Sequence, residues 1–276
     1  MMRKIIVHGG AAHLDDYMAA CLAWAYAVWK GDLSSFYDDT FKGVERRDPT
    51  PEDLADPSTW VLDVGGEISD ERHNWDHHQL PRGTKSCAMT LLADFLGIRS
   101  IIGKIFQWFE VRGEVDSCGP FATAKAMGME WSEVSKFMGP FEELALEEFK
   151  NDPTAAVRAL AQKVLRALVA YDRVGPLVKS GLTGQGIYVV DFTAADPDDV
   201  RVVEAAFTKD NGVSIFHDDR GNGLTLLRMC DDPIIDFSRC EGDEDVVFAH
   251  KGGFICKTVN KNIDAAMRLI AKAVKA

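Results

Sequence analysis

Three of the chain's seven histidines lie in one short stretch, RHNWDHHQ, which spans residues 72–79. The stretch also contains Asp76, so it combines imidazole nitrogens with a carboxylate, two donor types that hold divalent metal ions. His77 and His78 are adjacent, and in an extended segment adjacent side chains point to opposite faces. We therefore expect the two rings to perform different tasks.

A second group of chemically active residues lies near the N-terminus, in VHGGAAHLDD. His8 ends an apolar stretch, and His13 and Asp15 fall in the turn that precedes a helix-like segment. Asp63 lies near the end of another apolar stretch, in VLDVGG. Ligands of parallel α/β sheets bind at the carboxyl ends of the strands, and a buried carboxylate there costs several kcal/mol unless it is paired. This arrangement predicts a cation site.

Each of these residues also has an ordinary explanation. His8 alone is typical of a hydrogen-bonded core histidine, and Asp15 or Asp16 alone is typical of a helix start, where the dipole stabilises a carboxylate. Asp63 alone could cap a turn. Their joint position at one edge of one predicted sheet favours the cation site.

The elements that must position these residues follow from hydrophobic patterning. We predict buried strands at 4–8 and 60–64, a helix at 14–29, and a helix capped by Ser86 and stopped by Gly97. Helical patterns continue to about residue 178, including a long helix after Pro153. The remaining predicted elements are strands at 186–190, 213–216, 224–227 and 246–250 and helices at 197–208 and 263–275.

Length and composition predict a globular protein with two domains. The chain has 276 residues, of which 46% are hydrophobic and 27% charged. No segment approaches the length of a membrane span, and the apolar run at the N-terminus is too short for a signal peptide, so we expect a cytoplasmic protein. The six cysteines form no C-x-x-C pair, which favours reduced buried thiols over an extracellular disulfide set.

The net charge of −12 argues against a broad basic surface for long duplex nucleic acid. It is compatible with a phosphorylated small molecule or a short single strand that metal ions hold locally.

In this order, VHGGAAHLDD, VLDVGG and DHH resemble the motifs of the DHH phosphoesterase superfamily, which includes exonucleases, small-oligonucleotide nucleases and manganese-dependent pyrophosphatases. The stretches DVGG and ERH…DHHQ are similar to those of its Myg-type branch (melanocyte proliferating gene family). Lys85-Ser86-Cys87-Ala88 resembles the Ser-Ser-Ala helix start of that branch, and FAHKGGFI, residues 248–255, resembles its closing motif. Residues 121–186 match only loosely.

The resemblance implies a metal site. Its ligands would be His8, His13, Asp15, Asp63, His77 and Asp116. His13 stands where most superfamily members have an aspartate, and Asp116 lies in EVDSCG, where Ser-Cys replaces the expected asparagine. Asp172 is the alternative last ligand. Two divalent ions are implied, with Mn²⁺ preferred and Mg²⁺, Co²⁺ and Zn²⁺ left open.

The roles of the individual side chains follow from the chemistry of metal ligands and phosphate groups. Asp63 would bridge two ions, His77 would coordinate one, His78 would donate to a phosphate oxygen, and Asp76 would hold an imidazole in one tautomer. His73 is left without a task at the site. Substrate contacts are expected from His250, Lys251, Gly252, Gly253, Arg82 and Lys85. Taken alone, Gly-Gly after a strand is usually a plain turn, and a solvated loop is the better explanation of Arg82 and Lys85.

The expected architecture is α/β. A DHH-type catalytic domain with a parallel sheet would span residues 1–150, a helical connector 151–180, and a smaller α+β substrate-binding domain 181–276, with the active site in the cleft between the domains. The oligomeric state is left open, including a homo-oligomer.

The expected function is two-metal hydrolysis of phosphodiester bonds, in RNA or in short single-stranded oligonucleotides, as in an exonuclease. Three alternatives stay open. AAHLDD also resembles the His-x-Asp-Asp signature of zinc deacetylases of N-acetyl sugars, which need one zinc ion with an open position. The others are hydrolysis of a phosphoanhydride, as in a pyrophosphatase, and metal binding without catalysis.

Overall fold

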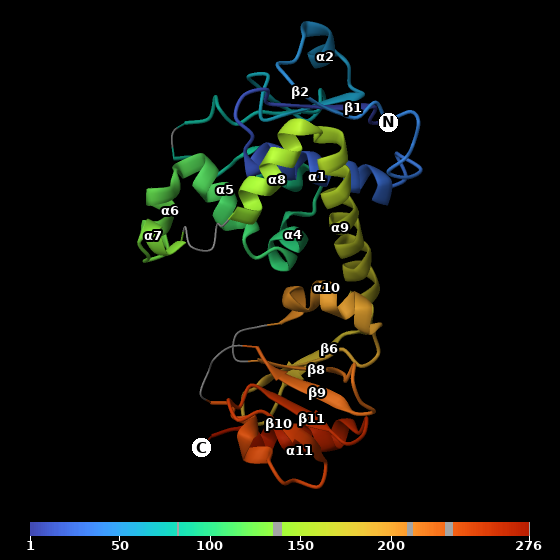
Figure 1. Ribbon diagram of the computed structural model, residues 1–276, viewed down its shortest axis with the longest axis vertical. Coiled ribbons are helices and arrows are strands. Elements are labelled where there is room, and N and C mark those ends of the chain that lie inside the picture. The colour runs from blue at the N-terminus through green and yellow to red at the C-terminus, as the bar shows by residue number, and fades with distance from the viewer. Residues whose placement is uncertain (82, 135–139, 209–211, 230–233, 276) are drawn as a thin grey trace. The chain divides into compact units, whose positions relative to one another are not determined.

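The computed structural model describes residues 1–276 except 82, 135–139, 209–211, 230–233 and 276. The chain divides into two compact units, unit 1 at Met1–Leu168 and unit 2 at Val169–Ala276. Each unit has its own hydrophobic core. Figure 1 shows the helices and strands of the chain.

Unit 1 is built on a five-stranded sheet. In chain order its strands are β1 (Lys4–Val7), β2 (Val44–Arg46), β3 (Thr59–Leu62), β4 (Ile68–Ser69) and β5 (Asn74–Trp75), and in space the order is β2-β1-β3-β5-β4. The pairs β1–β2, β1–β3 and β3–β5 are parallel, and only β4 runs antiparallel to its neighbour. Since β1, β3 and β5 are parallel, the residues that follow them, His8, Asp63 and Asp76, leave the sheet at one edge.

Two helices of unit 1 begin beside that edge. Helix α1 (Leu14–Trp29) matches the predicted range, and nearly all its side chains are buried in the core of unit 1. Helix α3 (Ala88–Phe95) packs against α1. Its N-cap is Cys87 rather than the predicted Ser86, because the N–H of Cys87 donates to Oγ1 of Thr90 at 2.9 Å and closes the first turn there.

The other helices of unit 1 are α2 (Pro51–Ala55), α4 (Arg99–Ile105), α5 (Phe109–Cys118), α6 (Pro120–Ala126), α7 (Trp131–Val134), α8 (Pro140–Asn151) and α9 (Pro153–Val174). The first part of α9 places Val157, Ala161, Val164 and Leu168 in the core of unit 1. The boundary between the two units therefore falls inside this helix, whose sequence pattern is continuous across it.

Unit 2 contains a six-stranded mixed sheet. Its strands are β6 (Lys179–Leu182), β7 (Tyr188–Asp191), β8 (Gly212–His217), β9 (Leu224–Arg228), β10 (Val246–Ala249) and β11 (Ile255–Thr258), in the spatial order β10-β11-β9-β8-β7-β6. Only β7 and β8 pair in parallel, connected by α10 (Pro197–Phe207). The predicted hairpin at 213–227 is confirmed as β8–β9.

Helix α11 (Ile263–Ala273) buries its apolar stripe, Ala266, Leu269, Ile270 and Ala273, in the core of unit 2. Two short 3-10 turns complete this unit, η2 (Gly175–Leu177) and η3 (Phe237–Cys240). An α/β fold with a mostly parallel first sheet and a mixed second sheet is thus confirmed.

None of the described helices is long and apolar enough to cross a membrane. The five described cysteines, Cys21, Cys87, Cys118, Cys240 and Cys256, are free thiols, as the sequence predicted, whereas Cys230 lies outside the described residues.

Candidate metal centre

At the carboxyl ends of β1, β3 and β5, the side chains of Asp15, Asp63, His77 and Asp116 meet, and we call this the polar edge of unit 1. Asp63 lies at its centre. It follows β3 directly, and its backbone has a φ of +60°, a left-handed conformation that is rare for residues other than glycine. Its side chain is 2% exposed, and its Oδ1 accepts no hydrogen bond from the described residues. A buried carboxylate is costly without a neighbouring positive charge, which a metal ion or a protonated imidazole can supply at this position.

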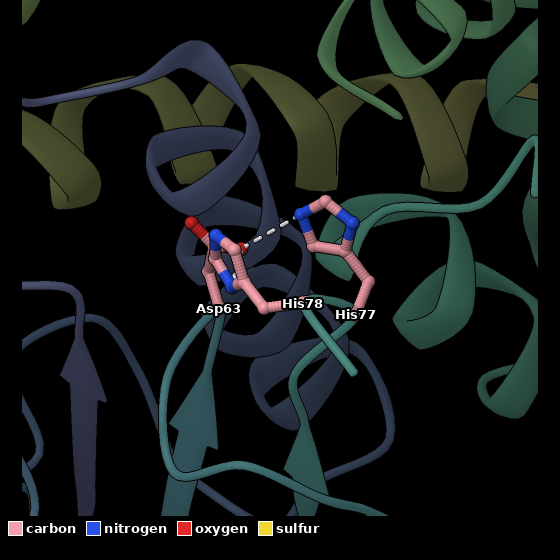
Figure 2. A group of neighbouring side chains, drawn as sticks. All are labelled: Asp63, His77 and His78. Carbon is pink, nitrogen blue, oxygen red and sulfur yellow. Dashed lines mark ion pairs between the residues drawn. The ribbon is translucent and has the colours of Figure 1, made fainter. Parts of the chain in front are cut away.

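His77 lies against this carboxylate (Figure 2). Its Nε2 is 3.2 Å from Oδ1 of Asp63, 3.1 Å from Oδ2 of Asp116 and 3.9 Å from Oδ2 of Asp15. Burial lowers the pKa of His77, but the close carboxylates of Asp116 and Asp63 and the negative charge of Asp15 outweigh this effect and raise the pKa to about 10. At neutral pH, an imidazolium therefore supplies positive charge among the carboxylates.

Asp15 belongs to the first turn of α1 and is also bonded to α3. Its Oδ2 accepts from the N–H of Ala88 at 2.9 Å, and its Oδ1 accepts from the N–H of Met89 at 2.7 Å. Burial, followed by the charges of Asp63 and Asp116, raises the pKa of Asp15 to about 7. The carboxylate thus tethers two helix starts and contributes negative charge to the cluster.

Asp116 reaches the cluster from the last turn of α5 and is the carboxylate within 3.1 Å of His77. Asp172, the alternative ligand in the sequence analysis, is an exposed residue near the end of α9 and belongs to unit 2. Of these two aspartates, the one that joins the cluster in unit 1 is Asp116.

His77 and His78 do not point to opposite faces, so that expectation was wrong. The two ring centroids are 4.6 Å apart, and Nδ1 of His78 lies 3.8 Å from Oδ1 of Asp63 (Figure 2). The chain is not extended here, because a turn starts at His77, where the N–H of Leu80 donates to the carbonyl of His77 at 2.9 Å. Both imidazoles consequently lie beside the same carboxylate.

Asp76 connects two of the sequence motifs. Its Oδ1 accepts from the N–H of His78 at 2.9 Å and lies 2.7 Å from Nδ1 of the same residue, and its Oδ2 accepts from the N–H of Gly66 at 2.7 Å. Burial raises the pKa of Asp76, but the hydrogen bonds from His78 and Gly66 outweigh it and lower the pKa below its usual value. The ionised carboxylate orients the ring of His78, whose side chain is 58% exposed.

His8 and His13 lie on the imidazole side of the site. Their rings stack with centroids 6.0 Å apart, and the ring of His8 is 6.5 Å from that of His78. Within the described part of the chain, neither ring belongs to a group of donor atoms close enough to hold a metal ion. The structure therefore brings four of the six predicted ligands, Asp15, Asp63, His77 and Asp116, into one cluster and leaves the two other imidazoles beside it.

His73, the unassigned histidine, has contacts that belong to the fold. Its Nδ1 lies 2.7 Å from the carbonyl oxygen of Pro57, and its ring stacks on that of Trp60 at 5.1 Å.

The residues predicted to contact substrate have mainly local contacts. Nζ of Lys85 donates to Oε1 of Glu114 at 3.0 Å, and Arg82 lies outside the described residues. His250, Lys251, Gly252 and Gly253 form the tight turn between β10 and β11.

Three residues of the site were missed by the sequence reasoning. Asp16 is fully buried with Oδ2 unpartnered within the described residues, and burial, Asp63 and Asp15 raise its pKa to about 8. Arg46, at the end of β2, donates to the carbonyl of Gly10 at 2.9 Å. Cys87 lies with Asp15 and Asp116 in a second group of donor atoms. Asp16 could have been found from the sequence, because it is the second aspartate of LDD. Arg46 and Cys87 reach the site only through the packing of β2 and α3, which no local sequence pattern predicts.

The donor set fits divalent metal ions. Two groups of side chains have donor atoms within 4.8 Å of one another, Asp63–His77–His78 and Asp15–Cys87–Asp116. His77 joins them, since its Nε2 contacts both Asp63 and Asp116. Carboxylates, imidazoles and a thiol together are typical ligands of first-row divalent metals.

Comparisons with known proteins add little. No family model and no curated protein matches the chain. One solved structure, described as the DHH domain of a member of a family of ribosomal proteins, is 13% identical with a TM-score of 0.32, and the match covers 100% of this chain and 88% of that one. A similarity this weak carries no argument, so the functional inference depends on the chain's own residues.

Proposed function

We propose that the polar edge of unit 1 is a divalent metal centre that hydrolyses phosphodiester bonds in RNA or in short single-stranded oligonucleotides. The observation that carries the proposal is the group of buried carboxylates around Oδ1 of Asp63. This oxygen has ion-pair contacts with the imidazoles of His77 at 3.2 Å and His78 at 3.8 Å. The resemblance of VHGGAAHLDD, VLDVGG and DHH to phosphoesterase motifs supports the choice of reaction.

Asp15, Asp63, His77 and Asp116 would hold metal ions, with His8 and His13 as further ligands on the imidazole side. A bound divalent ion would supply an activated water and would neutralise charge on a phosphate. Coordination would replace the proton that His77 holds in the metal-free chain, because a metal binds the neutral imidazole.

The residues of the chain would then orient the substrate. Asp76 fixes the ring of His78 through Nδ1, which leaves Nε2 to donate to a phosphate oxygen when the ring is doubly protonated. The exposure of His78 gives a substrate access to this ring. The acidic composition favours a short single strand over a long duplex, as expected for an exonuclease-like enzyme.

In unit 2, we assign substrate binding to the turn between β10 and β11. Lys251 is exposed there and carries positive charge suited to a phosphate.

The test is hydrolysis of bis(p-nitrophenyl) phosphate and of short RNA strands by the full chain loaded with Mn²⁺. Asp116→Asn should abolish turnover, whereas the matched control Asp172→Asn, at the exposed alternative position, should leave it unchanged. Cleavage of pyrophosphate alone, or deacetylation with one Zn²⁺ per chain, would replace the proposal with the corresponding alternative. No turnover with any of these substrates in metal-loaded protein would indicate a metal-binding protein without catalysis.

A further inference from the structure

Cys87 is a buried thiol beside the carboxylates of the metal centre. The residue is 0% exposed, and its Sγ and one oxygen each of Asp15 and Asp116 all lie within 4.8 Å of one another. The three donors come from three different elements, the start of α3, the first turn of α1 and the last turn of α5.

The packing holds Cys87 in this position. The first N–H groups of α3, those of Ala88 and Met89, donate to Asp15 and fix the helix start against the cluster. Helix α5 approaches closely from the other side, because a Cβ at Gly113 would lie 3.3 Å from the thiol sulfur. The sulfur is thus confined between the backbone of α5 and the carboxylate of Asp15.

A second observation, which does not involve Cys87, also indicates a cation at this edge of unit 1. Oδ1 of Asp63 is buried and has no hydrogen-bond partner within the described residues, and Nε2 of His77 lies between this oxygen and Asp116. The thiol therefore borders the buried carboxylates of the site.

Cysteine is an unusual residue at the N-cap of a helix, although Cys87 takes part in a capping box with Thr90. Serine, threonine, aspartate and asparagine are the favoured N-caps, since their side-chain oxygens accept hydrogen bonds from the first N–H groups of a helix. Here the N–H groups of Ala88 and Met89 donate to Asp15, and the sulfur keeps only the weak contacts of a capping box with Thr90, whose Oγ1 lies 3.6 Å from Sγ.

We propose that Cys87 is a thiolate ligand of the ion held by Asp15 and Asp116. The inference rests on the proposed function only in requiring a metal ion at this edge. On coordination the S–H bond breaks, a sulfur–metal bond forms, and the proton passes to solvent. Thiolate is a soft ligand, so this ion should be Zn²⁺, Co²⁺ or Fe²⁺ in preference to Mg²⁺.

The test is Co²⁺ titration of the full chain, followed by absorption spectroscopy. The wild-type protein should show a thiolate-to-cobalt charge-transfer band in the near ultraviolet together with visible d–d bands. Cys87→Ser should lose the charge-transfer band and keep the d–d bands, and it should lower the preference for Zn²⁺ over Mg²⁺ by about tenfold or more. Cys118→Ser, which changes a half-buried thiol on the same helix as Asp116, is the matched control and should keep both bands.

X-ray absorption at the zinc edge of the wild-type protein provides a second readout that does not depend on the folding of a variant. It should show a sulfur scatterer at about 2.3 Å, the usual length of a zinc–thiolate bond. If bound Co²⁺ shows only d–d bands, or if the zinc spectrum shows no sulfur scatterer, Cys87 is not a ligand. Either result would still support the metal centre itself. No uptake of either metal would overturn both proposals.

Discussion

The polar edge of unit 1 and the turn between β10 and β11 of unit 2 both contain glycines and histidines, but their polar atoms have different surroundings. At the edge of unit 1, carboxylates from separate elements are buried together, and an oxygen of Asp63 lacks a hydrogen-bond partner within the described residues. In the turn of unit 2, Nδ1 of His250 accepts from the N–H of Gly252 at 2.9 Å, and the N–H of Gly253 donates to the carbonyl of His250 at 2.8 Å.

The two regions differ in why a residue has a left-handed backbone. Gly253 has a φ of +70°, and a Cβ there would lie 2.3 Å from Oδ1 of Asp236, so backbone geometry alone explains it. Nothing local explains Asp63, which keeps a left-handed backbone and a buried charge at a cost to stability. A residue such as Asp63, which lowers stability without a local structural reason, is a stronger indication of function than a glycine that its turn requires.

The largest expected effect comes from Asp63→Asn. This substitution removes the central charge of the cluster, so uptake of Mn²⁺ should be lost, and turnover should fall by about 10³-fold or more, beyond what removing a residue that only supports a ligand costs. The metal-free variant should be at least as stable as the wild type, because one buried carboxylate no longer repels Asp15 and Asp16. Calorimetric metal titration, hydrolysis assays and thermal unfolding test this.

The second-largest expected effect is the difference in kcat between His78→Ala and His250→Ala. Loss of the oriented ring at the metal centre should lower kcat by about 10²-fold or more with metal binding retained, in the range of general acid catalysis. Loss of the ring in the turn should change kcat by less than about tenfold. Release of the metal by His78→Ala would show that His78 is a ligand. Equal effects on kcat would remove the distinction between the two regions.

The third effect concerns pH and is confined to unit 1. Folding raises the pKa of Asp15 to about 7, of Asp16 to about 8 and of His77 to about 10, from ordinary values of 3.8, 3.8 and 6.5. A group with a raised pKa adds stability below its ordinary pKa and loses that contribution as pH rises through the folded value. The metal-free protein should thus lose stability as the pH rises from about 4 to about 10.

Metal binding requires deprotonated ligands, so its contribution should grow over the same range. The increase in Tm on adding Mn²⁺ should be larger at about pH 8 than at about pH 6, as measured by thermal unfolding. A Tm increase that is independent of pH would indicate that the ion binds away from this cluster.

The smallest effect on turnover comes from Gly253→Ala. The strained backbone and the contact with Asp236 should lower the free energy of unfolding by about 2–5 kcal/mol, with kcat of the folded protein unchanged. Gly242→Ala is the matched control, since its φ is +79° but no atom lies within 4 Å of the added Cβ. It should cost only about 1–2 kcal/mol in denaturant titrations. A loss of kcat specific to Gly253→Ala would indicate that the backbone of the turn takes part in the chemical step and does more than bind the substrate.

Much of the fold could be predicted, because the decisive patterns are local. The apolar run before His8 and the continuous pattern of α1 predicted β1 and α1 closely. Strands β2, β4, β5, β6 and β11 were missed. Strands β2, β4 and β5 have only two or three residues each, and β6 is exposed throughout, so none of these four has a pattern long or apolar enough to recognise. The parallel pairing of β1 and β3, assumed in the sequence analysis, is present and brings the motifs to one edge.

The site was predicted less completely, because its geometry depends on turns and on helix packing. Adjacency in the sequence suggested opposite directions for His77 and His78, but the turn at Leu80 and the two contacts of Asp76 bring both rings to Asp63. Cys87 joins the cluster only because α3 docks on Asp15, a tertiary contact between residues more than 70 positions apart.

The most direct test of the central claim is a crystal structure of the Mn²⁺-soaked chain with anomalous data at the manganese edge. The account predicts two anomalous peaks at the polar edge of unit 1, both within coordinating distance of Asp63 and one beside Asp116. A single peak would contradict the two-metal centre, and the absence of any peak near Asp63 would contradict the assignment of this edge as a metal site.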